Sequence, residues 1–389
     1  MGAASARRKR RRRRRTWDRY ALPSAGDTGG GDADGEIACE EVDEVRMESI
    51  RVGIVGAGAN TVAQHIPNLQ AIEGVEIVSV CNRSRESSER VARQFNIPKV
   101  YDNWRELVDA PDTNAIVIGT WPYMHCPVTL AALQANKHVM TEARMAMNLR
   151  EARQMLEAAR ARPHLVTQVV PSPFTLKVDN TIKRLIAEGY LGDVLAIEVR
   201  AGGTFIDRES PLHWRQDFDL SGFNTMTLGI WYEAVMRWVG EAKRVTAMGK
   251  TFVTMRRDAE GNLRAVRIPD HLEVTAEMVC GAIAHFQISA VTGMAGGPEV
   301  WLFGSEGTLR FADGGLYGGR RGDSALSPIP IPPEEEGRWR VEEEFVNAIR
   351  GKERIKLTTF EDGVKYMEFT EAAIRSMAEG RAIAIGDLL

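Results

Sequence analysis

A glycine-containing turn is the first segment whose residue types point to a particular chemistry. An apolar, β-type stretch precedes it, and the turn holds Gly56, Gly58, Ala59 and Asn60 before a helical pattern of apolar residues begins. Gly56 permits a tight turn, and Gly58 lets the backbone approach a pyrophosphate at the helix N-terminus. Thr61 stands at the third glycine position, so the fingerprint is imperfect. The turn predicts a dinucleotide site formed by Gly56, Gly58, Ala59 and Asn60.

The end of the next apolar stretch bears on which dinucleotide binds. Asn82, Arg83 and Ser84 stand about twenty residues after the glycine turn, where proteins that bind NAD carry an acid for the ribose 2′-hydroxyl. Asn and Ser can hydrogen-bond a 2′-phosphate, and Arg can pair with one. We therefore predict NADP as the preferred cofactor, with NAD as the alternative. A purely solvated Arg83 is the simpler interpretation of that residue.

Two further turns place polar and aromatic side chains directly after apolar stretches. The first holds Thr120, Trp121 and His125, and the second holds Glu142 and Arg144. Ligands of parallel sheets bind outside the carboxyl ends of the strands. We therefore expect these five residues to line the nicotinamide end of the cofactor site.

The elements that must position these turns follow from periodicity. Short apolar stretches at 115–119, 138–141 and 166–170 alternate with helical segments, which indicates an α/β fold with a doubly wound parallel sheet, the Rossmann architecture. Later stretches, such as 271–278, alternate apolar and polar residues and are typical of antiparallel strands with one polar face. The Gly- and Pro-rich segment 314–333 is predicted to be a loop.

Composition excludes several classes of protein. The chain has 389 residues, of which 44% are hydrophobic and 26% charged, as expected for a globular protein of about two domains. It has no apolar stretch long enough to span a membrane. Its four cysteines form no C-x-x-C pair, so we predict no disulfide framework, no metal and a cytoplasmic location.

The first 49 residues differ from the rest. Nine consecutive basic residues at 7–15 precede a Gly- and acid-rich stretch, and such a segment is predicted to be disordered. A start at Met47 would remove it, so we favour a tail outside the working protein. The remainder is mildly acidic, which argues against nucleic-acid binding.

Four motifs make the chain similar to the Gfo/Idh/MocA oxidoreductases, which include glucose–fructose oxidoreductase and inositol dehydrogenase. They are the segment 137–142 ending in Glu142, the pair Thr120 and His125, the turn 188–192 and the hairpin 304–309. The resemblance runs over residues 50–389. It implies a Rossmann domain at 50–170 and, at 171–389, an α/β domain with a large, mostly antiparallel, open-faced sheet. It also implies a nicotinamide cofactor, sugar- or polyol-like substrates, and a homodimer or homotetramer formed through that sheet.

Three catalytic positions of the family pattern are changed here. The lysine position after Glu142 is Ala143, and the following proline position is Arg144. The family's Asp and His positions hold Thr227 and Trp231. A positioned base contributes roughly 10²–10⁴-fold to rate, and neither Ala, Thr nor Trp supplies one at neutral pH.

Other residues are candidates for the missing groups. His213 lies in a polar loop, has a suitable intrinsic pKa and is our first candidate, with His125 and Tyr232 as further ones. Arg144 cannot act as a base, and we expect it to bind a substrate anion or to stabilise an oxyanion. The leading hypothesis is an NADP-preferring oxidoreductase of hydroxy compounds with a non-standard proton relay. The alternatives are a non-catalytic NADP-binding or sugar-sensing protein and a redox-neutral lyase or glycosidase that keeps its cofactor tightly bound.

Overall fold

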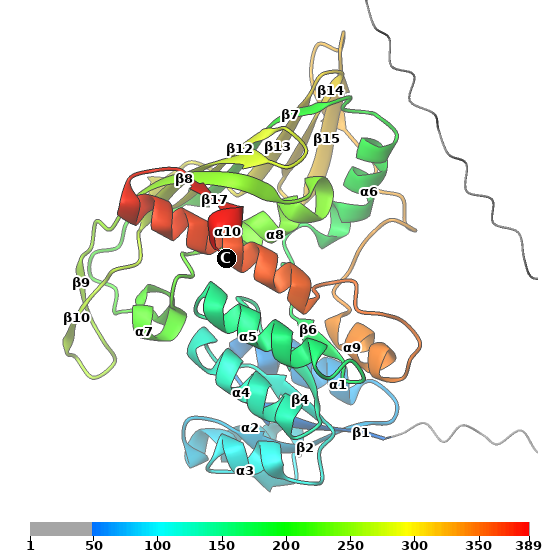
Figure 1. The fold of residues 1–389 in the computed structure, drawn as a ribbon, viewed down its shortest axis with the longest axis vertical. Coiled ribbons are helices and arrows are strands. Elements are labelled where there is room, and N and C mark those ends of the chain that lie inside the picture. Colours follow the sequence, from blue (N-terminus) through cyan, green and yellow to red (C-terminus); the bar gives the residue numbers. More distant parts are fainter. Residues whose placement is uncertain (1–48, 389) are drawn as a thin grey trace, which may run out of the picture. The chain divides into compact units, whose positions relative to one another are not determined.

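The structure is a computed structural model that describes residues 49–388 (Figure 1). Residues 47–389 form one compact unit. The predicted tail, its basic run and Met47 lie outside the described residues. Among the described residues, no helix is long and apolar enough to cross a membrane.

The first sheet confirms the predicted doubly wound architecture. Within residues 49–388 it has six parallel strands in the order β3-β2-β1-β4-β5-β6. The strands are β1 (Ile50–Val55), β2 (Val75–Cys81), β3 (Lys99–Val100), β4 (Ala115–Ile118), β5 (His138–Thr141) and β6 (Thr167–Val169). Every residue of β4 is buried, because separate apolar clusters cover the two faces of the sheet.

The helices between these strands are the π-helical turn η1 (Thr61–His65), which continues into α1 (Ile66–Gln70), then α2 (Arg85–Phe95), α3 (Trp104–Asp109), α4 (Pro122–Gln134) and α5 (Leu149–Arg160). Several start at the caps that their sequences supply. Ser84 accepts a hydrogen bond at the start of α2, and Asn148 does so at the start of α5. The glycine turn therefore leads directly from β1 into a helix, as predicted.

A nine-stranded sheet dominates the second half of the described chain, in the order β16-β15-β14-β13-β7-β12-β11-β8-β17. All neighbouring pairs are antiparallel except β7 with β12. Its strands are β7 (Val194–Gly203), β8 (Ala242–Lys250), β11 (His271–Met278), β12 (Ile283–Gly293), β13 (Glu299–Gly304), β14 (Gly307–Ala312), β15 (Gly315–Arg320), β16 (Ser327–Pro328) and β17 (Ile383–Ala384). The predicted open-faced, mostly antiparallel sheet is confirmed.

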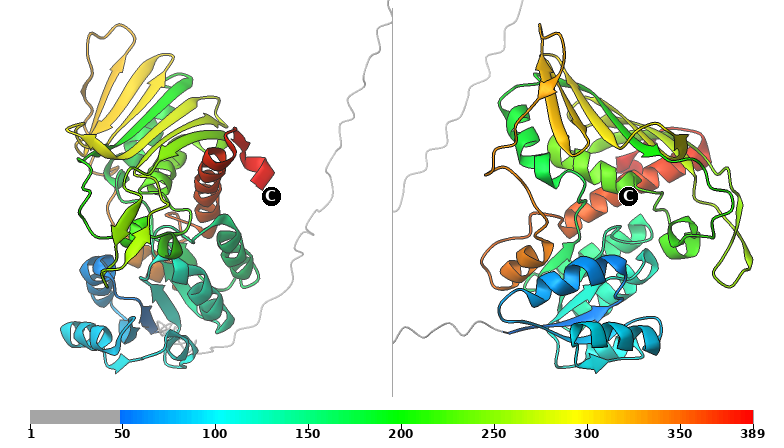
Figure 2. Two further views of the ribbon diagram at one scale, coloured as in Figure 1. Left: turned by 90° about the vertical axis from the view of Figure 1, so that its left-hand side faces the viewer. Right: turned by 180° about the vertical axis from the view of Figure 1, so that it is seen from behind.

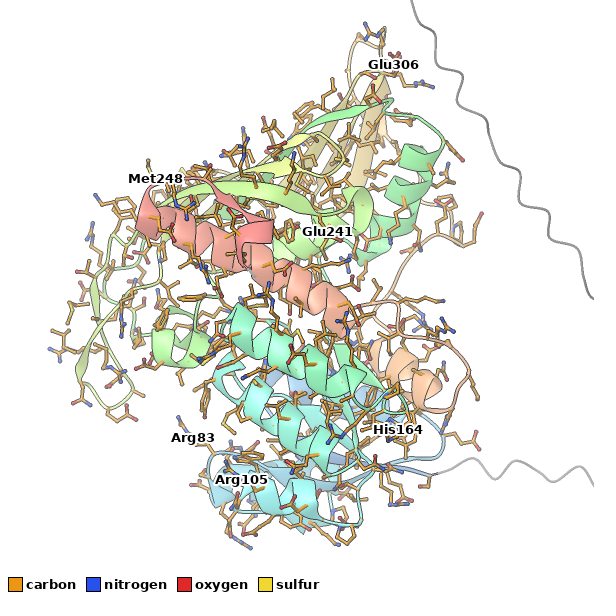
Figure 3. All side chains as sticks on the ribbon, viewed as in Figure 1. Arg83, Arg105, His164, Glu241, Met248 and Glu306 are labelled. Atoms are coloured by element: carbon orange, nitrogen blue, oxygen red, sulfur yellow. The ribbon has the colours of Figure 1, made fainter. Side chains whose placement is uncertain are left out.

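The other elements of this half are α6 (Leu176–Ala187), the 3-10 turn η2 (Trp214–Gln216), α7 (Phe218–Ser221), α8 (Leu228–Val239), the hairpin β9 (Met255–Arg257) and β10 (Leu263–Ala265), α9 (Val341–Ile349), α10 (Phe360–Glu379) and the 3-10 turn η3 (Ile385–Leu388). In Figure 2, α8 and α10 lie on one side of the nine-stranded sheet. The other side is open, and Met248, labelled in Figure 3, is 78% exposed there.

One expectation needs correction. The segment 314–333 contains β15 and β16 rather than only loop, because the glycines of β15 allow close packing against Tyr190 and Leu326.

A late segment of the chain packs against the first sheet. Helix α9 comes from the second half of the chain, but its Val341, Phe345 and Val346 pack into the apolar cluster of the first sheet. The first structural domain is therefore completed by a late segment.

Helix α10 joins the two halves. It contacts α5 of the first half and β8 and α8 of the second, and it runs between them in Figure 1. Residues of α5, α10 and the large sheet share one apolar cluster. This shared core fixes the strand ends of the first sheet relative to the second half.

The close approach of β1 and β4 generates a testable prediction. Gly119 directly follows β4, and a Cβ there would overlap Thr61 Oγ1 and the carbonyl oxygen of Gly56. Gly119→Ala should therefore destabilise the protein by about 1–3 kcal/mol, measured by urea unfolding. Gly386→Ala is the matched control, since a Cβ there meets no atom within 4 Å. Equal stability of the two variants would contradict the close packing of the turn.

Candidate functional site

Three adjoining cavities lie along the carboxyl ends of the first sheet and under the second. The turn cavity (about 380 Å³) is lined by Gly56, Gly58, Arg83 and Trp121, among others. The central cavity (about 480 Å³) shares Gly58 and Trp121 with it. The sheet cavity (about 620 Å³) shares Phe174, His213, Arg215 and Thr227 with the central cavity. Together they form a continuous row from the glycine turn to the large sheet.

The glycine turn fits a dinucleotide pyrophosphate. Gly56 has φ +84°, and a Cβ on Gly58 would lie 3.1 Å from the Gly119 carbonyl oxygen. The first helical turn has no side-chain cap, and the buried hydroxyls of Thr61 and Thr120 have no partner among the described residues. Free donors beside an open glycine backbone are what a phosphate requires. Ala59 and Asn60 line the adjoining central cavity.

The three residues predicted to select NADP have different surroundings. Asn82 Oδ1 accepts a hydrogen bond from Ala57 N at 2.6 Å, and Ser84 caps α2. Both side chains therefore already have a hydrogen-bond partner in the protein, and Asn82 also lines the turn cavity. Arg83 lines the turn cavity, lies 6.0 Å from the Trp121 ring, and forms no ion pair within residues 49–388. Sequence reasoning missed Asp102, which also lines this cavity and pairs with Arg85 at 2.8 Å.

A buried chain of charges supports the central cavity. Glu142 Oε1 accepts hydrogen bonds from Asn60 Nδ2 at 2.6 Å and from His65 Nε2 at 3.1 Å. The other ring nitrogen of His65, Nδ1, donates to Glu342 Oε1 at 2.5 Å. With a carboxylate on each nitrogen and no exposed side-chain surface, the His65 ring is an imidazolium. We call Glu142, His65 and Glu342 the carboxylate–imidazolium chain.

The pKa shifts of His65 and Glu142 agree with these contacts. Burial alone would lower the pKa of His65, but the hydrogen bonds that its ring donates to Glu142 and Glu342 outweigh it and raise the pKa to about 9. Burial alone would raise the pKa of Glu142, but the bond to His65, with that of Asn60, lowers it to about 2. Glu142 is therefore a fully ionised acceptor whose oxygens are occupied. No local pattern of residues indicates this carboxylate–imidazolium chain, because His65 and Glu342 are 277 positions apart.

His125 and Tyr232 do not reach a cavity as expected. Both ring nitrogens of the fully buried His125 lie at about 3 Å from carbonyl oxygens, those of Arg144 and Thr120. The Tyr232 hydroxyl accepts a hydrogen bond from Ala242 N at 2.8 Å, and its ring stacks on Phe369 in the core of the second half. Neither side chain lines one of the three cavities. This corrects their predicted catalytic roles: His125 joins the two turns, and Tyr232 supports packing.

Arg144 lies in the wall of the central cavity. Its backbone has φ +62°, a left-handed conformation that is rare outside glycine and is found at functional sites. The next residue holds it in place, since Met145 N donates to the Tyr366 hydroxyl of α10. The guanidinium donates to the Met226 carbonyl and lies 5.4 Å from the Trp214 ring. Burial, and then the charge of Arg215, lower the pKa of Arg144 to about 9, so it stays charged at neutral pH.

The loop that carries His213 is braced from the β9–β10 hairpin. Leu212 N donates to the Arg257 carbonyl at 2.7 Å, and the guanidinium of Arg256 donates to the carbonyls of Ser210 and Asp207 at 2.8 Å each. These bonds project His213 into the central and sheet cavities. Trp214 stacks on Trp121 with ring centroids 6.0 Å apart, so the loop meets the first sheet's turn.

The protonation of His213 follows from its neighbours. Arg215 N donates to His213 Nδ1 at 3.2 Å, which leaves Nε2 as the protonated nitrogen of the neutral ring. Burial, followed by the charges of Arg215 and Arg144, lowers the pKa of His213. At neutral pH the ring is therefore an uncharged hydrogen-bond donor at the edge of two cavities.

The residues that the resemblance aligned with the family's catalytic positions also face these cavities. Ala143 and Thr227 line the central cavity, and Trp231 lines the sheet cavity, where it packs on Phe174 at 4.7 Å between ring centroids. Among the described residues, no group of three or more His, Cys, Asp and Glu side chains has the arrangement of a metal site.

Comparisons with known proteins match a separate family model to each half of the chain. A model of the oxidoreductase family with an NAD-binding Rossmann fold matches residues 50–169, and a model of the GFO/IDH/MocA C-terminal domain matches residues 180–310. Trans-1,2-dihydrobenzene-1,2-diol dehydrogenase of Mus musculus is 26% identical over 65% of this chain and 76% of that protein. The matches to the rabbit and pig enzymes span 60% and 61% of those proteins.

Levoglucosan dehydrogenase of Pseudarthrobacter phenanthrenivorans is 24% identical over 76% of this chain and 84% of that protein. An oxidoreductase domain protein from Kribbella flavida has a TM-score of 0.75 at 22% identity and covers 87% of this chain and all of its own. Levoglucosan dehydrogenase in complex with NADH and L-sorbose has a TM-score of 0.74 at 21% identity, over 86% of this chain and 98% of that one. These structural likenesses show the shared fold.

The carboxylate–imidazolium chain generates a stability prediction. His65→Ala leaves Glu142 and Glu342 buried without their cation, so unfolding free energy should fall by about 3–5 kcal/mol. The folded pKa of His65 lies above its ordinary value, so its contribution is complete below pH 6.5 and disappears as pH rises through about 9. Urea unfolding across that range should show a smaller pH dependence in the variant.

The control is His164→Ala, because His164 is exposed and its ring bonds the side chain of Asn136. In the view of Figure 3, His164 and Arg83 are labelled on opposite sides of the first half of the chain. Equal unfolding free energies of the two variants at pH 6.5 would contradict a stabilising role of the carboxylate–imidazolium chain.

Proposed function

Because this chain belongs to the Gfo/Idh/MocA oxidoreductase family, we propose that it transfers hydride between a nicotinamide dinucleotide and a hydroxy compound. The substrate would be a sugar, a polyol or a related diol, and NADP would be preferred. The observation that carries the proposal is the continuity of the turn cavity, which fits a pyrophosphate, with the central cavity. The names of the relatives, dihydrodiol and levoglucosan dehydrogenases, support the substrate class.

The chain's own residues would hold the cofactor along this row. Gly56 and Gly58 would cradle the pyrophosphate, Arg83 would meet the 2′-phosphate, and Thr120 and Glu142 would face the nicotinamide half. When bound, the nicotinamide supplies the hydride acceptor or donor. Trp121 and Trp214 would close over the cofactor at the junction of the turn and central cavities.

His213 is the group we propose to contact the reacting oxygen. It is the only one of the three predicted catalytic candidates, His213, His125 and Tyr232, that lines a cavity of the described protein. Its Nε2–H can donate a hydrogen bond to that oxygen as negative charge develops, while the hydroxyl proton itself is exchanged with solvent. This is an electrophilic role and differs from the base that the family's lysine and histidine positions supply. Glu142 is less suited to take a proton, because its oxygens already accept from Asn60, His65 and Ala143.

A second candidate is binding of the cofactor without turnover. The observation that favours it is that Ala143, Thr227 and Trp231, which replace the family's polar groups, all face the cavities. Tight NADPH binding with no hydride exchange across a panel of sugars and diols would favour this function. Tight binding with exchange would favour the oxidoreductase.

The cofactor preference is tested by titration. NADPH and NADH fluorescence on binding should give a clearly lower Kd for NADPH. Arg83→Ala should raise the Kd for NADPH about tenfold or more, since a charge-assisted hydrogen bond contributes about 1.5–3 kcal/mol. The Kd for NADH should stay nearly unchanged. Arg105→Ala is the control, because Arg105 lies on α3 over Trp104 and does not line the turn cavity. Equal loss for both cofactors would remove the proposed role of Arg83.

The role of His213 is tested by kinetics on a hydroxy compound that the protein oxidises. His213→Ala should lower kcat/KM by about 10²–10³-fold, and His213→Gln, which keeps a donor, should retain more activity. Protonation at Nδ1 leaves the Nε2–H in place, so the donor role predicts no fall of kcat/KM as the ring protonates. The lowered pKa of His213 puts that protonation below pH 6.5. His164→Gln is the control. A loss below tenfold in His213→Ala would end this assignment.

A further inference from the structure

The central cavity has a strongly basic side. Arg144 comes from the turn after β5 and Arg215 from the loop before α7, and both guanidiniums lie over the ring of Trp214, at 5.4 and 4.3 Å from its centre. His213, on the same loop, adds a hydrogen-bond donor. Two cations from distant segments therefore converge on one wall of the cavity.

No acidic side chain of residues 49–388 forms a direct ion pair with either arginine, although the charge of Glu142 acts on both and opposes the lowering of their pKa by burial. Within residues 49–388, neither Arg144 nor Arg215 forms an ion pair, and the only polar contact of the Arg144 guanidinium is the Met226 carbonyl. Glu142 is the one carboxylate lining the central cavity, and its oxygens accept from His65, Asn60 and its neighbour's backbone. Arg144 is only 7% exposed. A buried guanidinium with no direct ion-pair partner, beside a carboxylate that is already engaged, is stabilised when an anion enters.

The pair stands apart from the part of the row that fits the cofactor's phosphates. Arg215 lines the central and sheet cavities, Arg144 lines the central cavity, and neither lines the turn cavity. In the turn cavity, the glycine turn and Arg83 already supply the groups proposed to bind the phosphates of the cofactor. An anion bound by Arg144 and Arg215 would therefore belong to a molecule other than the dinucleotide cofactor.

The sheet cavity indicates what the rest of that molecule looks like. It continues from Arg215 and His213 under the large sheet, and most of its wall is apolar, with Phe174, Ile288 and Phe311 among its lining residues. Its volume of about 620 Å³ accommodates the body of a small organic compound. An anionic group at the arginines would leave the uncharged body in this cavity.

We propose that the substrate is a hydroxy compound that carries an oxyanion group, a carboxylate or a phosphate, bound between Arg144 and Arg215. The bond geometry suits both groups, since the planar guanidinium forks match carboxylate and phosphate oxygens. This inference rests on the proposed oxidoreductase function and narrows its substrate class from sugars and diols in general to their anionic members.

The test uses the full chain saturated with NADPH and isothermal titration of matched probes. D-glucose is compared with D-glucuronate and D-glucose 6-phosphate, and benzyl alcohol is compared with mandelate. At least one anionic probe should bind ten times or more tightly than its neutral partner. Preference for D-glucuronate or mandelate would identify a carboxylate, and preference for D-glucose 6-phosphate a phosphate. Equal or weaker binding of every anionic probe would overturn the inference.

Variants locate the effect. Arg215→Gln changes an exposed side chain, so the fold should persist, and it should reduce the anionic preference at least tenfold while the Kd for NADPH stays the same. Arg208→Gln removes a charge from the same loop outside the cavities and should change neither value. Weaker NADPH binding in Arg215→Gln would assign the pair to the cofactor and overturn the inference. Failure of the unaltered protein to bind NADPH or NADH would instead contradict the proposed function.

Discussion

The position of the whole site depends on one buried cation. His65 stands between Glu142 and Glu342 with its side chain completely removed from solvent. Burying a charge is tolerable only when it is paired with good geometry, so the three residues must meet. The chain thereby ties the end of β5, the helix after the glycine turn and α9 to one another. Two of these elements bound the central cavity directly, through Asn60 and Glu142.

The cavities need both halves of the chain. The first sheet supplies the glycine turn and the turns after β4 and β5, and the second half supplies the loop with His213, Trp214 and Arg215. Helix α10 keeps the halves in place, since its Tyr366 accepts from Met145 beside Arg144. The ring stack of Trp121 on Trp214 closes the same junction from the other side. A site of this kind is sensitive to packing far from its reactive groups.

The electrostatics of the central cavity come from two arginines on distant segments. Arg144, whose left-handed backbone sits in the cavity wall, and Arg215 both lie over the ring of Trp214. Glu142 is the one carboxylate that lines this cavity in the described part of the chain, and its oxygens are already engaged by hydrogen bonds. Two cations beside an engaged carboxylate favour a negative charge on a ligand.

The sequence by itself determined the features that depend on local pattern. The alternation of apolar stretches and helices predicted the parallel sheet, and the strand–turn–helix order around Gly56 and Gly58 predicted the pyrophosphate cradle. Tertiary structure alone decided what depends on distant partners. It paired His65 with Glu342, brought α9 back to the first sheet, and buried His125 and Tyr232, because hydrogen bonds and packing across hundreds of positions leave no period in the sequence.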